Sequence, residues 1–313
     1  MCYSARIIAD YKKYVRMFGA DISLRDFVKL FWEWNNVDAK LPRSLLMAFR
    51  DEPDIAPLIA EHDAKQKVEL EQLMFAQRQR LVEAERKLQT KTTKSALESQ
   101  RIAASKIEWA VGKMAELRRT EPVDDDLRIF PRWHAPVMVV VDGRRVVMPM
   151  RYQCRPADKP AFYDDKFPGT YNARRDNLEG FWKGQFGYTH GVMLADAFYE
   201  NVPRHKAEGR ELQQGEKPEN LILEFAPRTG EVMLIACLWS RWSAPGQPDL
   251  LSFAAITDEP PPEVAAAGHD RCVIPIKPEY VDAWLNPDPK NLAAQYAILD
   301  DRERPYYEHR LAA

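Results

Sequence analysis

An α+β fold is predicted by three features of the 313-residue sequence. Apolar residues recur at helical spacing within the first fifty residues, and a long charged helical region follows. After Pro122 the pattern changes to short runs rich in Val, Ile and aromatic residues, which are typical of strands. Because strands and helices do not alternate regularly, the pattern favours α+β over a doubly wound parallel sheet.

The first fifty residues carry two helix signals. Ser23 and Asp26 have the spacing of a capping box, and an apolar face follows them to Trp34. Pro42 then stands where the first turn of a shorter helix begins, and that helix is expected to run to about Phe49.

Residues 54–121 differ from the rest of the chain in composition. Gly and Pro almost vanish, and two sparse apolar stripes are separated by the polar residues 89–94. Ser95 and Glu98 then offer a new capping box, so the pattern predicts a long helical hairpin inserted into a single domain of residues 1–313. Residues 61–120 contain 13 Lys and Arg against 9 Asp and Glu, a net charge of +4. That charge favours a solvated helix surface, and the sharper alternative is a partner-binding or dimerising arm.

The region after Pro122 is predicted to form a sheet. Asp142 and Gly143 suit the two central positions of a type I′ turn, so residues 137–141 and 144–150 should pair as a hairpin. Residues 286–313 are expected to form a C-terminal helix and tail. The further strands are predicted at residues 192–195, 221–225, 232–239, 253–257 and 272–276, and helices at 279–285 and 291–299.

Charge and hydropathy exclude several classes of protein. The net charge of -2 excludes a uniformly basic nucleic-acid coat but permits a local basic groove. No apolar run approaches the roughly 20 residues of a membrane helix, and no signal peptide is evident, so we expect a soluble, cytoplasmic protein without a membrane partner. No phosphate-binding loop or dinucleotide motif occurs, so no cofactor is predicted.

The four cysteines have no zinc-site spacing and form no CxxC pair, so no metal is predicted. Cys2 is a special case, because removal of Met1 would give it a free α-amine beside its thiol. Such an aminothiol condenses with an aldehyde to an imine and then closes a thiazolidine ring, and it can also attack an amide. The alternative is that cysteine stands at position 2 by chance and has no functional role. The other three cysteines, which we expect to be reduced, are Cys154, Cys237 and Cys272.

Three short segments carry further candidate chemistry. Asn172 offers a donor and an acceptor, and Arg174 offers a planar fork for a phosphate or carboxylate. Glu200 follows an apolar strand, where partial burial would suit a general acid or base. His269 and Arg271 stand just before another apolar run. Each of these residues alone has an ordinary structural explanation.

Taken in order, these segments resemble the SOS-response-associated peptidase (SRAP) family. The resemblance covers roughly residues 1–20 and 131–285, with the hairpin as an insertion. Departures such as Asn201 after Glu200 and Cys272 after Arg271 indicate a divergent branch. The segments that carry the resemblance are Met1-Cys2, Asn172–Arg174, Phe198-Tyr199-Glu200 and His269-Asp270-Arg271.

The resemblance implies binding to single-stranded DNA and covalent capping of abasic sites in the DNA damage (SOS) response. It implies that the Cys2 amine attacks the sugar aldehyde and that Glu200 manages the protons. It also implies that Asn172 orients the reacting groups and that His269 protonates the sugar oxygen. The family name adds a possible self-processing peptidase activity, and binding to DNA would bring the protein to the nucleoid.

Arginines are expected to hold the DNA backbone in this family. Arg174 and Arg271 would bind flanking phosphates, with Arg6 and Arg151 as weaker candidates for the same groove. The resemblance further implies a curved mixed sheet that approaches a barrel and gathers the catalytic residues at one cleft. Two alternatives stay open: an N-terminal-nucleophile cysteine amidohydrolase, and a non-enzymatic partner-binding protein organised by the hairpin. The oligomeric state is not predicted.

Overall fold

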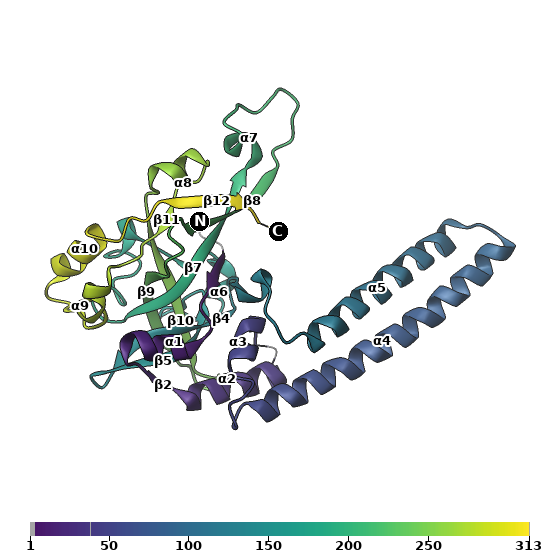
Figure 1. Cartoon of the computed structure of the whole chain (residues 1–313), viewed down its shortest axis with the longest axis horizontal. Helices are drawn as coiled ribbons and strands as arrows, with labels where there is room; N and C mark the ends of the chain where they lie inside the picture. The colour runs from purple at the N-terminus through teal and green to yellow at the C-terminus, as the bar shows by residue number, and fades with distance from the viewer. Residues whose placement is uncertain (1–3, 38, 313) are drawn as a thin grey trace. The chain divides into compact units, whose positions relative to one another are not determined.

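The computed structural model describes residues 4–37 and 39–312, and it divides into two compact units. The first unit consists of Met1–Ala48 and Val123–Ala313, and the second of Phe49–Pro122 (Figure 1). The first unit combines one large mixed sheet with short helices, so the predicted α+β class is confirmed.

The sheet of the first unit contains the following twelve strands within the described residues: β1 (Ser4–Ile7), β2 (Asp21–Ile22), β3 (Arg128–Ile129), β4 (His134–Val141), β5 (Arg144–Tyr152), β6 (Asn172–Arg174), β7 (His190–Pro203), β8 (Asn220–Pro227), β9 (Met233–Trp242), β10 (Leu250–Asp258), β11 (Cys272–Val273) and β12 (Tyr307–Leu311). Five of them pair in a closed circuit, in the order β10, β5, β4, β7, β9 and back to β10. The other strands extend this ring. β1 and β3 continue from β7, and β2 pairs with β5. β11 and β6 flank β10, and β8 joins β7 to β12.

The hairpin of β4 and β5 forms as its sequence dictates. Asp142 and Gly143 have φ angles of 50° and 73°, so both central residues of the turn are left-handed, as a type I′ turn requires. Val137, Met138 and Val139 are all fully buried. Both faces of β4 are therefore covered, which explains its continuous apolar run.

The longest strand, β7, extends well beyond the predicted residues 192–195. The part of β7 beyond Ala195 contains Asp196 and Glu200, and these charged residues interrupt the apolar run by which a strand is predicted. Both carboxylates have partners in the fold: Arg6 donates to Asp196 at 2.6 Å, and His269 lies 3.0 Å from Glu200.

Short helices surround the ring of strands. Tyr14 is buried and fastens the first helix to the sheet, because its hydroxyl donates to the Pro136 carbonyl and accepts from the Leu194 amide. The sequence missed β1 and β2, which are too short for a periodic signal. It also missed β12, which pairs with β8 in the region where we expected the C-terminal tail. The helices are α1 (Tyr11–Phe18), α2 (Leu24–Val37), α3 (Arg43–Ala48), α6 (Tyr163–Lys166), α7 (Arg204–Ala207), α8 (Pro262–Ala266), α9 (Val281–Leu285) and α10 (Leu292–Asp300), with 3₁₀ turns at η1 (Asp124–Leu127), η2 (Arg175–Asn177) and η3 (Pro278–Tyr280).

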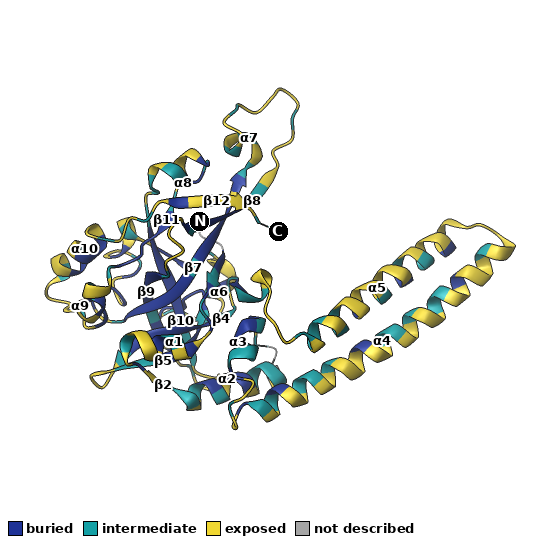
Figure 2. Cartoon of the chain, in the orientation of Figure 1, coloured by how far each residue is buried: buried dark blue, intermediate teal, exposed yellow. Residues whose placement is uncertain are grey.

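The second unit is a helical hairpin of α4 (Ala56–Thr90) and α5 (Lys94–Arg118), which lie side by side. Its second helix begins with Thr93 as the N-cap, whose side chain accepts from the Ala96 amide, two residues before the expected Ser95. Most of the hairpin surface is exposed (Figure 2). The buried seam consists of Leu70 and Ala84 on α4 and Ala96, Ala103 and Ala110 on α5.

Among the described residues, no helix is both long enough and apolar enough to cross a membrane.

Candidate functional site

A buried carboxylate and imidazole form the centre of the candidate site. His269 Nε2 lies 3.0 Å from Glu200 Oε2, and the two side chains are 7% and 0% exposed. The other ring nitrogen, Nδ1, lies 3.0 Å from the Arg271 carbonyl and 3.3 Å from the Arg271 amide. Since Arg271 offers Nδ1 both an acceptor and a donor, the ring can carry its proton on either nitrogen. The pair is therefore suited to taking up and releasing a proton.

A β-bulge determines which face of the sheet Glu200 occupies. On β7, Ala197 pairs with Arg6 of β1, but the next residue of β1, Ile7, pairs with Ala195. Asp196 is thus an extra residue, and it reverses the alternation of side chains beyond it. The Asp196 side chain accordingly bonds to Arg6, on one face, while Glu200 emerges on the other.

Asn172 lies on the same face as Glu200. Paired residues in neighbouring strands share a face of a sheet, and one such row crosses β7, β9, β10 and β6. This row consists of Gly191, Cys237, Ala255 and Asn172. Side chains alternate along β7, so Ala195 lies on the same face as Gly191. The bulge at Asp196 then places Glu200 on that face too.

The side chain of Asn172 is buried and has unused hydrogen-bonding capacity. The residue is 7% exposed, and neither amide atom makes a hydrogen bond to residues 4–37 or 39–312. Buried amides without a partner are costly and are a reason to look for a ligand. A cavity of about 400 Å³ opens beside Asn172 and is also lined by Arg174.

Three aromatic residues, Phe167, Phe181 and Trp182, line this cavity. The ring centroids of Phe181 and Trp182 are 4.9 Å apart, and Tyr163, behind the lining, lies 4.3 Å from Phe167 and 6.4 Å from Phe181. Phe167 is 39% exposed, so its ring is accessible. Exposed rings next to cations can stack nucleobases while the cations meet the phosphates.

Two arginines that the sequence predicted to bind phosphate lie at the border of the site. The guanidinium groups of both have N–H donors that are exposed or lack a close partner among the described residues. Arg174 is half exposed, and its fork pairs with the exposed Asp176 at 3.0 and 2.7 Å. Arg271 is 15% exposed, and its nearest carboxylate, on Asp270, is 3.8 Å away. An exposed ion pair contributes little, so a phosphate can displace Asp176 from Arg174 at small cost.

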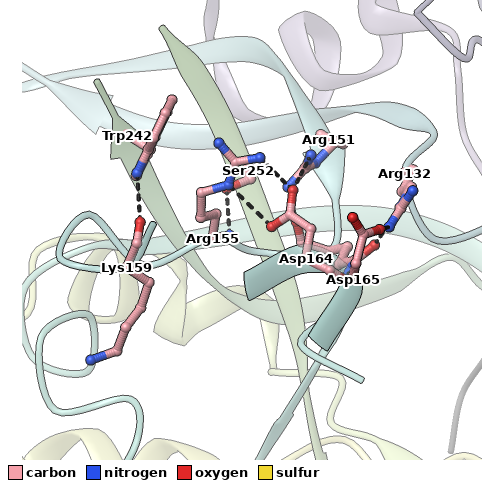
Figure 3. A network of polar contacts seen from close by, with 9 residues as sticks. Arg132, Arg151, Arg155, Lys159, Asp164, Asp165, Trp242 and Ser252 are labelled. Atoms are coloured by element: carbon pink, nitrogen blue, oxygen red, sulfur yellow. Dashed lines mark hydrogen bonds and ion pairs between the residues drawn. The ribbon is translucent and has the colours of Figure 1, made fainter. Parts of the chain in front are cut away.

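The two weaker candidates, Arg6 and Arg151, are tied to carboxylates inside the first unit. Arg6 pairs with Asp196 at 2.6 Å and with Glu224 at 3.1 Å. Arg151 pairs with Asp164 at 2.8 Å, and both side chains are almost fully buried (Figure 3). Either arginine would have to leave a buried partner before it bound a phosphate.

Asp164 organises a polar cluster that the sequence did not reveal. It accepts hydrogen bonds from Arg155 as well as pairing with Arg151, and the Arg155 guanidinium lies 4.3 Å from the Trp242 ring centroid (Figure 3). Burial alone would raise the pKa of Asp164, but hydrogen bonds from the two arginines outweigh it and hold the pKa below its usual value. The cluster braces residues 155–170, the segment that leads to Asn172.

The cysteine thiols in the described part of the chain lack the low pKa of a reactive cysteine. Cys154, Cys237 and Cys272 are buried, and burial raises the pKa of each thiol, that of Cys154 to about 12. Cys2 lies outside the described residues. The first described residue, Ser4, pairs with Tyr199, so β1 runs beside the strand position next to Glu200.

A family model described as SOS response associated peptidase (SRAP) matches residues 85–310, which is more than half of the chain. No curated protein matches the sequence significantly. Among solved structures, a protein from Bordetella bronchiseptica is 18% identical with a TM-score of 0.46, covering 60% of this chain and 87% of its own. A phage-related protein from the same organism is 19% identical with a TM-score of 0.45, covering 63% and 85%. A protein from Bacteroides thetaiotaomicron is 14% identical with a TM-score of 0.46, covering 61% and 79%.

Proposed function

Because the chain belongs to the SOS response associated peptidase (SRAP) family, we propose that it binds single-stranded DNA and covalently caps abasic sites through Cys2. The observation that carries the proposal is the buried Glu200–His269 pair beside the strand that starts at Ser4. A reaction that begins with an amine and an aldehyde needs a group that moves protons in both directions, and this pair has that character.

The chemistry requires removal of Met1, which gives Cys2 a free α-amine. The amine adds to the C1′ aldehyde of the opened sugar to form a carbinolamine, which loses one water to give an imine. The Cys2 thiolate then adds to the imine carbon, and the nitrogen takes up a proton as the thiazolidine ring closes. The net change is the loss of one water. Glu200 accepts the proton of the attacking amine, and His269 donates one to the departing hydroxyl.

The residues around the pair take binding roles in this proposal. The unused amide of Asn172 holds the opened sugar or the Cys2 terminus. Arg174 and Arg271 hold the flanking phosphates, which fix position without reading sequence. The rings of Phe167 and Phe181 offer a surface for a neighbouring base. Arg6 and Arg151 would join only after a rearrangement of their buried ion pairs.

The decisive test is the intact mass of the protein after incubation with a single-stranded oligonucleotide that carries one abasic site. We expect a chain without Met1 and a denaturation-resistant adduct at the summed mass minus one water. An oligonucleotide with a tetrahydrofuran abasic analogue, which lacks the aldehyde, is the matched control and should give no adduct. Cys2→Ala should abolish the adduct, and normal crosslinking by that variant would refute the proposal.

A second candidate is an N-terminal-nucleophile amidohydrolase, which the family description as a peptidase favours. In this case Cys2 attacks an amide carbonyl, and Asn172 stabilises the oxyanion. The protein would then form an acyl-enzyme with an activated amide and ignore the abasic oligonucleotide. Removal of Met1 by the protein's own cysteine would be the simplest reaction of this type. It would show as retained Met1 in a Cys2→Ala variant.

A further inference from the structure

A buried arginine fastens the start of strand β1. Arg128 of β3 is 7% exposed, and its Nε donates a hydrogen bond to Ser4 Oγ at 2.8 Å. Ser4 is 1% exposed, so water does not compete for this hydrogen bond. A hydrogen bond from a charged donor is stronger than one between neutral groups. The side chain of Arg128 therefore holds Ser4 firmly in place.

The same guanidinium lies over an aromatic ring of β7. Its central carbon is 3.9 Å from the ring centroid of Tyr199 and 4.9 Å from that of Phe130. A guanidinium is attracted to the face of an aromatic ring, and more strongly where water is excluded. Tyr199 is 4% exposed and lies opposite Ser4 in the antiparallel pairing of β1 with β7. Arg128 therefore binds two side chains that face each other across these strands.

The contact with Ser4 extends beyond the backbone pairing of β3. β3 pairs with β1 at Ala5 and Arg6 but, among the residues that the structure describes, not at Ser4. The side chain of Arg128 thus reaches one residue further toward the N-terminus than the backbone of β3 does. The position of Ser4 depends on this side chain as well as on the sheet.

The contact leaves the face of the sheet with the candidate site free. Glu200 is the next residue after Tyr199 along β7. Because successive side chains of a strand point to opposite faces, Ser4 and Tyr199 share one face and Glu200 lies on the other. Arg128 therefore ties β1 to β7 from the face opposite to the one on which Glu200 meets His269.

We propose that Arg128 is a positioning residue for the reaction of Cys2, an inference that rests on the function proposed above. Only two residues of chain lead from Ser4 to Cys2, and they span at most roughly 7 Å. A displacement of Ser4 is therefore passed on to the Cys2 amine. Because a misplacement of about 1 Å can slow a reaction by about 100-fold, holding Ser4 keeps the amine where Glu200 accepts its proton.

Two substitutions remove the hydrogen bond from opposite ends. Ser4→Ala removes the acceptor, and Arg128→Lys keeps a cation near the Tyr199 ring but replaces the Nε donor with a methylene group. At saturating abasic oligonucleotide, both variants should form the adduct at least about tenfold more slowly than wild type. Their Kd for the tetrahydrofuran oligonucleotide should stay within about threefold of wild type, because neither residue is proposed to touch DNA. Single-turnover gels measure the rate, and fluorescence anisotropy measures the Kd.

A double-mutant cycle tests whether the two residues act through one contact. The variant Ser4→Ala/Arg128→Lys has no further hydrogen bond to lose, so it should crosslink about as slowly as either single variant. Independent effects would multiply instead, to about 100-fold or more, and that result would overturn the proposal. The control Arg145→Gln removes an arginine that bonds to Asp282 and to the Phe18 carbonyl, and it should crosslink at the wild-type rate.

A small aldehyde separates the position of Cys2 from its intrinsic reactivity. Glyoxylate condenses with a free N-terminal aminothiol without any bound DNA, so both single variants should react with it at the wild-type rate. Intact mass measures this reaction and confirms that Met1 has been removed from each variant. An equal slowing toward glyoxylate and toward the abasic oligonucleotide would overturn the proposal, because the defect would then lie in the aminothiol itself.

The same experiment distinguishes a failure of this inference from a failure of the proposed function. If wild type forms the adduct and Cys2→Ala does not, but both single variants crosslink as fast as wild type, only the role of Arg128 is refuted. If wild type forms no adduct, the proposed function fails and this inference fails with it. Circular dichroism checks that each variant is folded.

Discussion

A fully buried carboxylate is costly unless a partner meets it, and Glu200 meets His269 at 3.0 Å. Replacing Glu200 by Gln keeps the shape of the side chain and removes its basicity. We expect Glu200→Gln to slow adduct formation by about 100-fold or more, while DNA affinity stays within about threefold. Single-turnover gels with the abasic oligonucleotide measure the rate, and fluorescence anisotropy with the tetrahydrofuran oligonucleotide measures the affinity. The control Glu219→Gln changes an exposed carboxylate and should match wild type; equal rates for both variants would exclude Glu200 as the proton carrier.

Asp164 and Asp165 are neighbours in sequence with opposite environments. Asp164 is buried between Arg151 and Arg155, whereas Asp165 is 78% exposed and pairs with Arg132. Asp164→Asn leaves two buried guanidinium groups without their counter-charge and should lower the free energy of unfolding by about 3–5 kcal/mol. Asp165→Asn should cost less than about 1 kcal/mol. Urea denaturation of both variants measures the difference, and similar losses would mean that the cluster is not the brace we describe.

His190 provides a pH-dependent term in stability. It is buried, its Nδ1–H donates to the Trp284 carbonyl, and its Nε2 accepts from the Gly187 amide, so the neutral ring fits its partners. Burial lowers the pKa of His190 to about 3. Between this value and the unfolded pKa of about 6.5, only the unfolded chain binds the proton, so stability falls as the pH falls, by at most about 1.4 kcal/mol per pH unit.

The contribution of His190 can be isolated by urea denaturation at pH 7 and pH 5. The wild-type protein should lose more free energy of unfolding over this interval than His190→Gln does. His309→Gln, which changes an exposed histidine, should lose as much as wild type. Equal losses for wild type and His190→Gln would show that the buried ring does not resist protonation.

At this scale the sequence located some residues and missed others. Short motifs single out Glu200 and His269, and the structure brings their side chains into contact, while their catalytic roles stay a prediction. Asp164 and Arg155 were missed because a single acid and a single base in a turn-rich loop have no periodicity. Their pairing depends on how residues 155–170 fold back on β5 and β10.

Among the elements, the strength of the local signal decided what could be predicted. The hairpin of β4 and β5 and the two long helices have strong turn or periodic patterns, and all of them form. The two-residue strands and β12 owe their conformation to pairing with distant strands, as β12 does with β8. Such pairing leaves no mark in a short window of sequence.

Two glycines illustrate how differently an element can depend on one residue. Gly112 lies inside α5 with open space around the position of a Cβ atom, so Gly112→Ala should stabilise the helix by about 0.5–1 kcal/mol. Gly268 has a φ of +96°, and a Cβ atom there would approach Lys206 Cβ at 2.7 Å and Val202 Cγ1 at 2.9 Å. Gly268→Ala should therefore destabilise the protein and displace the neighbouring His269. Thermal melts give both signs, and a neutral Gly268→Ala variant would contradict the packing described.

At the scale of the whole molecule, we expect the first unit to carry the crosslinking activity without the hairpin. Within the first unit, α3 and η1 contact each other, so the chain leaves and re-enters that unit at adjacent points. Deleting residues 54–121 and inserting a short Gly/Ser linker closes only a small loop, which costs little conformational entropy. We expect the shortened protein to form the abasic-site adduct at a rate within about threefold of wild type.

The crosslinking assay on the shortened protein measures this rate, and circular dichroism checks that the protein is folded. Loss of crosslinking by a folded, shortened protein would assign the hairpin to the chemistry.

Because of the bulge at Asp196, the face of the sheet that Glu200 occupies depends on the number of residues in β7 and not on which residue stands at position 196. A substitution at this position changes one side chain and leaves Glu200 on its face of the sheet. Loss of the single codon for Asp196 would remove the extra residue, and every side chain beyond it would change faces, Glu200 included. An in-frame deletion of these three bases would therefore inactivate the site by turning Glu200 to the other face of the sheet, although every downstream amino acid stays the same.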